Sequence, residues 1–234
     1  MRRTPIKAAT AIKAALAAAA VGGVIAGCAP VQMGAAAIVG NDRISTAQLD
    51  SEVSVLATAA KPYAGAIQLT AAQMPKQVLS WLIRFRVRDE LATRDGLTVS
   101  PSQNQQALAS IYAQASQQAA QAGVSNVSLT ELAVANGLPP DLLKELGRYQ
   151  AIEIAYAEAQ NGGKLPTNSA SVTAITQRFS HAECLTYKSA PVHVNPQYGT
   201  MNYSQNSVVA APATLSRTEG AASGASASGQ SPSC

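Results

Sequence analysis

The segment from about Thr70 to Arg94 constrains the fold more than any other part of this sequence. Its large apolar residues recur at helical spacing, at Val78, Leu79, Leu82, Ile83, Val87 and Leu91. This spacing predicts one long amphipathic helix whose apolar face must be covered by other elements. Pro75 fits the first turn of such a helix, and Gly96 fits its end.

The same segment carries three arginines, Arg84, Arg86 and Arg88. They are too widely spread around a helix to form one basic patch, and Asp89 and Glu90 offset their charge. We therefore interpret them as part of a solvated helix face.

Other segments begin with capping residues and end at Gly, Asn or Pro, which is typical of further helices. The predicted ranges are 45–61, 100–122, 128–136 and 139–161, and the pattern over 172–178 is compatible with a short helix. Residues 35–39 and 190–194 read as strands, the first followed by a turn at Gly40-Asn41-Asp42. The fold class is therefore mainly α.

The helix predicted over 100–122 differs from the others in composition. The segment opens with a capping residue, Ser100, and a proline for the first helical position, Pro101. Gln103 can then pair with the cap. Beyond them the segment is rich in Gln and Ala, so it has high helix propensity but a narrow apolar face.

The N-terminus has the pattern of an export signal. The first thirteen residues hold Arg2, Arg3, Lys7 and Lys13 and no acidic residue. The apolar stretch that follows, from Ala14 to Gly27, is shorter than the about 20 residues needed to span a bilayer. We expect residues 1–27 to be a cleaved signal peptide.

Ile25-Ala26-Gly27-Cys28 resembles the bacterial lipobox, which implies that Cys28 carries a lipid and that residues 28–34 form a lipidated linker. The alternative is an ordinary signal cut at a small residue nearby, with Cys28 left as a plain thiol.

Without residues 1–27, 13 of the 17 basic residues remain against 13 acidic ones. A near-neutral exported chain gives no electrostatic indication of nucleic-acid binding.

If Cys28 is lipidated, Cys184 and Cys234 remain as an even pair in a compartment where disulfides persist. A disulfide between them would hold the C-terminal tail near the body.

From about Ser204 onward the chain has almost no large apolar residue, and we expect residues 204–234 to be disordered.

Two separated segments resemble one known family. Ala36 to Ser45, followed by a helix near Leu49, resembles the opening of the N-terminal domain of SurA-type chaperones. Val194 to Gly199 resembles a closing strand-and-turn motif of lipoproteins in that group. The resemblance covers about residues 35–203 and implies a bundle of about five helices in which the first and last segments pair as two strands.

The resemblance also implies a holding chaperone that binds unfolded or exported polypeptides. With the lipobox, it leads us to expect a chaperone that is lipid-anchored on the extracytoplasmic face of the cell membrane. A cleft between amphipathic helices suits such clients, since it can cover apolar side chains of varied sequence. The candidate client-binding residues are Leu82, Phe85, Leu108, Ile111, Tyr112 and Tyr149. For each of them the alternative is ordinary core packing.

We find no pattern that predicts catalysis or a cofactor. Many relatives carry a parvulin-type isomerase domain, and residues 161–189 are too few to form one, so no isomerase activity is expected. His181, Glu183, Cys184 and His193 have the residue types of a metal site, but the disulfide competes for Cys184 and we predict no metal. No set of Ser, His and Asp can be nominated.

The main alternative to a chaperone is a structural or adaptor lipoprotein that serves one dedicated partner in the cell envelope. The polar, Gln-rich segment 100–122 favours this alternative, because a general holding chaperone is expected to expose more apolar area. An enzyme is a third alternative, resting on the cluster of His and Cys residues.

Overall fold

The computed structural model describes residues 33–65, 69–124, 126–211, 232 and 234. The predicted signal peptide, the predicted lipidation site Cys28 and residues 212–231 of the predicted tail lie outside this part. Within the described residues, every helix is too short or too polar to cross a membrane.

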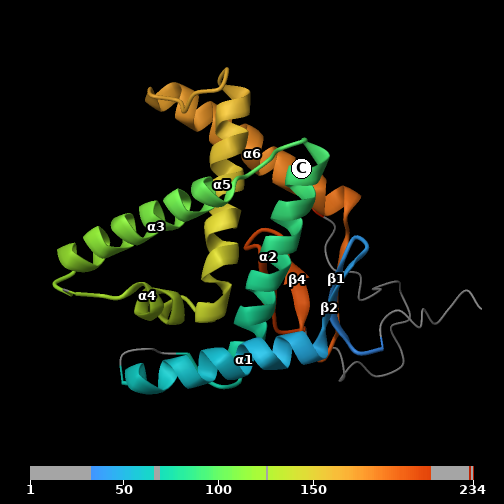
Figure 1. The fold of residues 1–234 in the computed structure, drawn as a ribbon. Helices are drawn as coiled ribbons and strands as arrows, with labels where there is room; N and C mark the ends of the chain where they lie inside the picture. The colour runs from blue at the N-terminus through green and yellow to red at the C-terminus, as the bar shows by residue number, and fades with distance from the viewer. Residues whose placement is uncertain (1–32, 66–68, 125, 212–231, 233) are drawn as a thin grey trace, which may run out of the picture. The chain divides into compact units, whose positions relative to one another are not determined.

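Helix α2, Met74–Arg94, is the central element of the described domain (Figure 1). It packs against α1 (Thr46–Ala60), α5 (Leu143–Gln160) and α6 (Ser169–Ser189). Its bounds agree with the segment predicted from apolar periodicity, and Pro75 lies in its first turn. The prediction of a mainly helical fold is confirmed.

A three-stranded antiparallel sheet joins the two ends of the domain. The strand order is β2-β1-β3, with β1 at Ala35–Val39, β2 at Asp42–Ser45 and β3 at Val192–Val194. The register places Ala37 opposite Val194, so the predicted pairing of the first and last segments is confirmed. β2 was not predicted, because the strand has only four residues and two of them are exposed.

The remaining helices begin where their caps predicted. The Ser45 hydroxyl caps α1, and Ser100 forms a capping box with Gln103 at the start of α3, Pro101–Gln121. Ser128 caps α4, Leu129–Ala135, and a short 3-10 turn over Pro140–Leu142, η3, leads into α5.

Helix α6 corrects the prediction of a short helix over 172–178. It has 21 residues, begins after the Asn168 cap and ends at Ser189. Its buried residues are Ile175, Phe179, Ala182, Thr186 and Tyr187. The face is narrow and its second half is polar in sequence, so apolar periodicity alone does not extend the helix past Arg178.

The expectation of disorder from Ser204 onward is wrong for the first residues of that segment. β5, Ser207–Val209, pairs antiparallel with β4, Thr200–Asn202. This hairpin is held on α2, since the Val208 amide donates to Ser80 Oγ at 2.8 Å and Arg84 Nε donates to the carbonyl oxygen of Asn206 at 2.6 Å. Val208 of β5 is also a member of the buried core, so the segment is ordered by covering α2.

The solvated face predicted for the arginines is also wrong for Arg88, which is only 4% exposed. Its guanidinium lies 3.3 Å from Glu153 of α5 and 3.2 Å from Glu183 of α6. It also stacks over the rings of Tyr149 and Phe179, at 3.8 and 4.3 Å from their centroids. Arg88 therefore joins α2, α5 and α6.

The sulfur atoms of Cys184 and Cys234 are bonded in the structure, across a sequence separation of 50 residues. A cross-link that closes a loop of this length is expected to stabilise a fold by about 4 kcal/mol, mainly by restricting the unfolded chain. It attaches the C-terminal end of the chain to α6.

Candidate functional site

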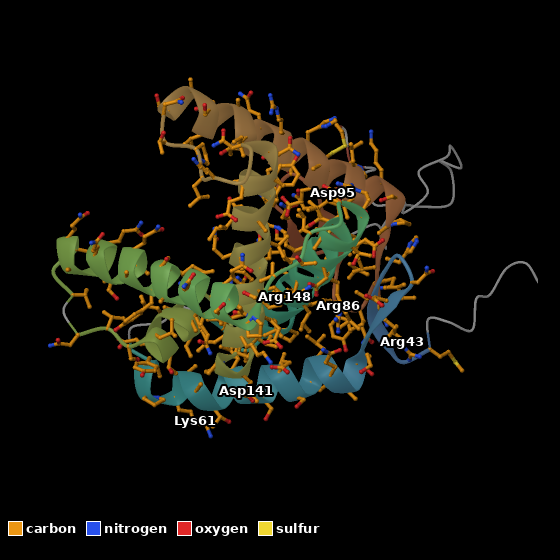
Figure 2. All side chains as sticks on the ribbon, turned by 45° about the horizontal axis from the view of Figure 1, so that its top comes forward. Arg43, Lys61, Arg86, Asp95, Asp141 and Arg148 are labelled. Carbon is orange, nitrogen blue, oxygen red and sulfur yellow. A yellow bond between two sulfur atoms is a disulfide. The ribbon has the colours of Figure 1, made fainter. Side chains whose placement is uncertain are left out.

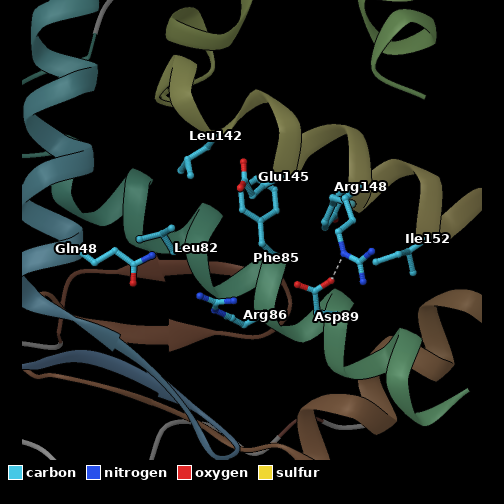
Figure 3. A pocket seen from close by; sticks show the side chains of 10 residues that line it. Gln48, Leu82, Phe85, Arg86, Asp89, Leu142, Glu145, Arg148 and Ile152 are labelled. Carbon is cyan, nitrogen blue, oxygen red and sulfur yellow. Dashed lines mark hydrogen bonds and ion pairs between the residues drawn. The ribbon is translucent and has the colours of Figure 1, made fainter. Parts of the chain in front are cut away.

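A cavity opens between α1, α2, η3 and α5 (Figure 3). Its volume is ≈ 110 Å³, which suits a single apolar side chain better than a cofactor, since ligand sites for larger molecules usually exceed about 300 Å³. The lining residues are Gln48, Leu82, Phe85, Arg86, Asp89, Leu142, Glu145, Arg148, Tyr149 and Ile152.

The apolar part of this lining is fixed by aromatic packing. Phe85 lies 5.9 Å from the Tyr149 ring in an edge-on arrangement, and Trp81 packs against both rings. Burial raises the pKa of Tyr149, and the guanidinium of Arg88 opposes part of that rise. Side chains held in this way give the cavity a preformed wall.

The polar rim holds one ion pair and two further residues of opposite charge. Arg148 Nε donates to Asp89 Oδ1 at 2.7 Å, so these two charges compensate each other. For Arg86 and Glu145, no ion pair or side-chain hydrogen bond is found within the described residues. Figure 2 shows Arg86 and Arg148 where α2 and α5 face each other.

Carboxylates gather on the α1 and η3 side of the rim. Glu52 of α1 lies near Asp141 of η3 and Glu145 of α5. Burial and the repulsion from these two acids raise the pKa of Glu52, and its Oε2 atom is buried with no hydrogen-bond partner in the described part of the chain. Neither Glu52 nor Asp141 is among the residues that line the cavity, and within the lining Arg86 and Arg148 balance Asp89 and Glu145.

The six residues predicted to bind clients divide into two groups. Leu82, Phe85 and Tyr149 line the cavity, although Leu82 and Phe85 are also members of the buried core. Leu108, Ile111 and Tyr112 lie on α3 and are not part of this lining.

Helix α3 is attached to α5 at a point of close approach. A Cβ atom built on Gly147 of α5 would lie 2.8 Å from the carbonyl oxygen of Asn104 and 3.2 Å from Leu108 Cβ. Tyr112 is 37% exposed and its hydroxyl donates to the carbonyl oxygen of Val127 at 3.0 Å. The α3 residues of the predicted set therefore serve packing at least in part.

The residues considered as metal ligands have other roles or lie apart. Cys184 is bonded to Cys234, and Glu183 pairs with Arg88. His193 lies on β3, while His181 lies on α6. Among the residues that the structure describes, no group of three or more potential ligands is close enough to hold a metal ion.

Sequence reasoning missed most of the cavity rim. Arg86 and Asp89 follow Leu82 and Phe85 by three or four positions, and so share their face of α2. Glu145 and Ile152 lie four positions before and three positions after Tyr149 on α5, and Leu142 lies seven positions before it, in η3. Helical spacing from the predicted apolar residues could have found these positions, but it could not show that the two faces meet.

The described residues form a mainly helical domain with a small cavity between α1, α2, η3 and α5. The chain matches the family model described as the SurA-like N-terminal domain over residues 1–150, and it therefore belongs to that family. The match includes every lining residue of the cavity except Ile152. No curated protein and no solved structure matches the chain. Membership of this family indicates a chaperone-like role related to protein folding.

Proposed function

We propose that this protein is an extracytoplasmic, lipid-anchored chaperone that binds unfolded or exported polypeptides through the cavity between α1, α2 and α5. The membrane anchor is the lipid on Cys28, and no prolyl isomerase activity is involved. The family membership supports the chaperone role, and the lipobox-like sequence supports the anchor.

The cavity is the observation that carries this proposal. It offers apolar walls from Leu82, Phe85 and Leu142 beside polar side chains that lack partners of their own within the described residues. An unfolded polypeptide presents both an apolar side chain and free backbone groups, which are the two kinds of surface that such a cavity can satisfy. The small volume means that one side chain is held at a time, which suits weak and sequence-tolerant binding.

The proposal is tested by closing the cavity. Gln48 lies on its α1 side, so Gln48→Tyr places a bulky side chain at the opening without removing a core residue. We expect the full-length variant to suppress aggregation of an unfolded client several-fold less well than the parent, as measured by light scattering.

The matched control is Gln177→Tyr, the same substitution at an exposed position of α6 away from the cavity. Thermal unfolding monitored by circular dichroism should show that both variants are folded. If both suppress aggregation as well as the parent, the cavity is not the client site.

The expected lack of isomerase activity rests on residues 161–189, most of which form α6. We expect no acceleration of folding in a refolding assay limited by proline isomerisation. Acceleration that depends on the amount of this protein would contradict the proposal.

An adaptor role is the second candidate, and α3 is the observation that favours it. Only Ala107 of its residues is buried, and the sequence from Leu97 to Thr130 contains no charged residue. A long neutral surface rich in amides suits one dedicated partner better than many apolar clients.

Crosslinking of the anchored protein in living cells, followed by mass spectrometry, separates the two roles. Many unrelated exported proteins, captured mainly during secretion, would support the chaperone. One stoichiometric partner would support the adaptor and contradict the chaperone.

A further inference from the structure

The hairpin of β4 and β5 lies against α2 as a small sheet of its own (Figure 1). β5 pairs with β4 along one edge, with Val208 opposite Met201. Its other edge faces α2, where the Val208 amide donates to Ser80 Oγ at 2.8 Å. The carbonyl oxygen of Asn206 accepts from Arg84 Nε at 2.6 Å. β5 therefore fills a slot whose two sides, β4 and α2, both bind its backbone.

The two α2 side chains are spaced to bind an extended backbone. Ser80 and Arg84 are one helical turn apart and so lie on the same face of α2. Asn206 and Val208 are two positions apart, which is the spacing at which backbone groups of a strand point to the same side. Both contacts are made to main-chain atoms, so they place no restriction on the side chains of the bound segment.

Contacts within α2 hold both of these side chains in place. Ser80 Oγ donates to the Lys76 carbonyl oxygen at 2.6 Å, which leaves its lone pairs to accept from the strand. The Arg84 guanidinium stacks over the Trp81 ring, 4.9 Å from its centroid, and makes no ion pair among the described residues. A fixed acceptor beside a charged donor suits the amide and carbonyl groups of an extended chain.

The slot also has one apolar position. Val208 is 6% exposed and belongs to the buried core, whereas its neighbours Ser207 and Val209 are only partly buried. One apolar side chain therefore enters the domain, while the residues on either side of it point elsewhere. An unfolded polypeptide offers the same combination of free backbone groups and scattered apolar side chains.

We propose that the slot between α2 and β4 is a second binding site for extended segments of unfolded polypeptides, and that β5 is its internal occupant. A client segment replaces β5 by strand addition to β4. Its backbone binds Ser80 and Arg84, and a valine-sized side chain takes the place of Val208. This inference rests on the chaperone role proposed above but not on the cavity. β5 lowers the apparent affinity for clients in proportion to the time for which it covers the slot.

Gly199→Ala vacates the slot without changing a residue of α2 or β4. A Cβ atom built on Gly199 would overlap the Val209 carbonyl oxygen of β5, and the backbone φ of +130° is itself unfavourable for a side chain. The matched control is Gly162→Ala, since Gly162 also has a positive φ, +66°, but a Cβ atom there meets nothing within 4 Å.

Fluorescence anisotropy on the full-length chain in detergent measures access to the slot. The probe is a labelled peptide with the sequence of residues 204–210. We expect it to bind Gly199→Ala about tenfold or more tightly than the parent, because a slot covered by β5 is open for about 10% of the time or less. Gly162→Ala should bind it as weakly as the parent, and the same peptide with aspartate in place of Val208 should bind none of them.

Two further measurements locate the site and its occupant. In the Gly199→Ala background, Arg84→Met should weaken peptide binding several-fold, whereas Arg86→Met, on the same helix but outside the slot, should leave it unchanged. An excess of reduced and alkylated, unfolded protein should displace the peptide. If Arg84→Met has no effect, or if the unfolded protein does not compete, the inference is overturned.

Hydrogen exchange shows whether β5 can leave the folded domain. In Gly199→Ala, residues 207–209 should lose protection while α2 keeps it. Loss of protection in both would show that β5 is an integral part of the core, and the inference would be wrong.

The outcomes separate this inference from the proposed function. If the peptide binds neither the parent nor Gly199→Ala, while Gln48→Tyr weakens the suppression of aggregation, the slot is wrong and the cavity remains the client site. If Gln48→Tyr has no effect while the unfolded protein displaces the peptide, the slot is supported and the cavity is wrong. If neither result is obtained, both fail together.

Discussion

Helices α2 and α3 have the same length of 21 residues but opposite roles in the fold. α2 has ten buried residues and contacts the sheet, the C-terminal hairpin and three other helices. α3 has one buried residue and packs mainly on α5. In Figure 1 it extends from α5 to the side away from α2.

This contrast shows two ways in which a chain poor in large apolar residues can hold a long helix. α2 is stabilised by tertiary burial, including that of a charged residue, Arg88. α3 depends on its own helix propensity, on its cap and on one close contact at Gly147. The cavity lies among the helices that are fixed by tertiary packing, because α2 and α5 supply most of its wall.

Removing the charge of Arg88 should lower the free energy of unfolding more than any other substitution proposed for these helices. Arg88→Met leaves Glu183, whose side chain is 14% exposed, without its partner and removes the stacking on Tyr149 and Phe179. We expect the free energy of unfolding to fall by about 3 kcal/mol, as for other broken buried pairs. Chemical denaturation measures this change.

Arg86→Met is the matched control on the same helix, because Arg86 has no ion pair among the described residues. It should change the stability by less than about 0.5 kcal/mol. Equal effects of the two substitutions would show that Arg88 does not join the three helices.

The attachment of α3 should be the next most sensitive point. Gly147→Ala improves helix propensity by about 1 kcal/mol but forces a Cβ atom against the Asn104 carbonyl oxygen. We expect a net loss of about 2 kcal/mol from the displaced contact. Hydrogen exchange should become faster in α3 while α2 stays protected.

Gly65→Ala is the control for this substitution, since a Cβ atom there meets nothing within 4 Å. It should be neutral or slightly stabilising. If Gly147→Ala leaves the exchange of α3 unchanged, the close approach to α5 does not hold that helix.

The same contrast explains how much of the fold the sequence could predict. The spacing of large apolar residues predicted α2, and the capping residues Ser45, Ser100 and Ser128 marked the starts of three helices, because these signals are local. The pairing of the first and last strands came from the resemblance to a family and was confirmed.

Features that depend on distant partners could not be predicted. Arg88 meets carboxylates 65 and 95 positions later in the chain, so nothing near it marks it as buried. The β4–β5 hairpin likewise is ordered by Ser80 and Arg84, which lie far earlier. Three of the six candidate client-binding residues line the cavity, whereas the charges of its rim depend on how two helix faces meet.

The smallest loss of stability is expected for a substitution at the cap of α3. Ser100 Oγ accepts a hydrogen bond from the Gln103 amide, and the Gln103 side chain accepts one from the Ser100 amide. Ser100→Ala removes half of this box and should cost about 1 kcal/mol. Because α3 has little tertiary burial, the loss should appear as fraying of its first turn, measured by faster amide exchange of residues 101–104, with no change in α2. An equal loss of protection in both helices would mean that α3 is as tightly coupled to the core as α2, and the contrast between them would fail.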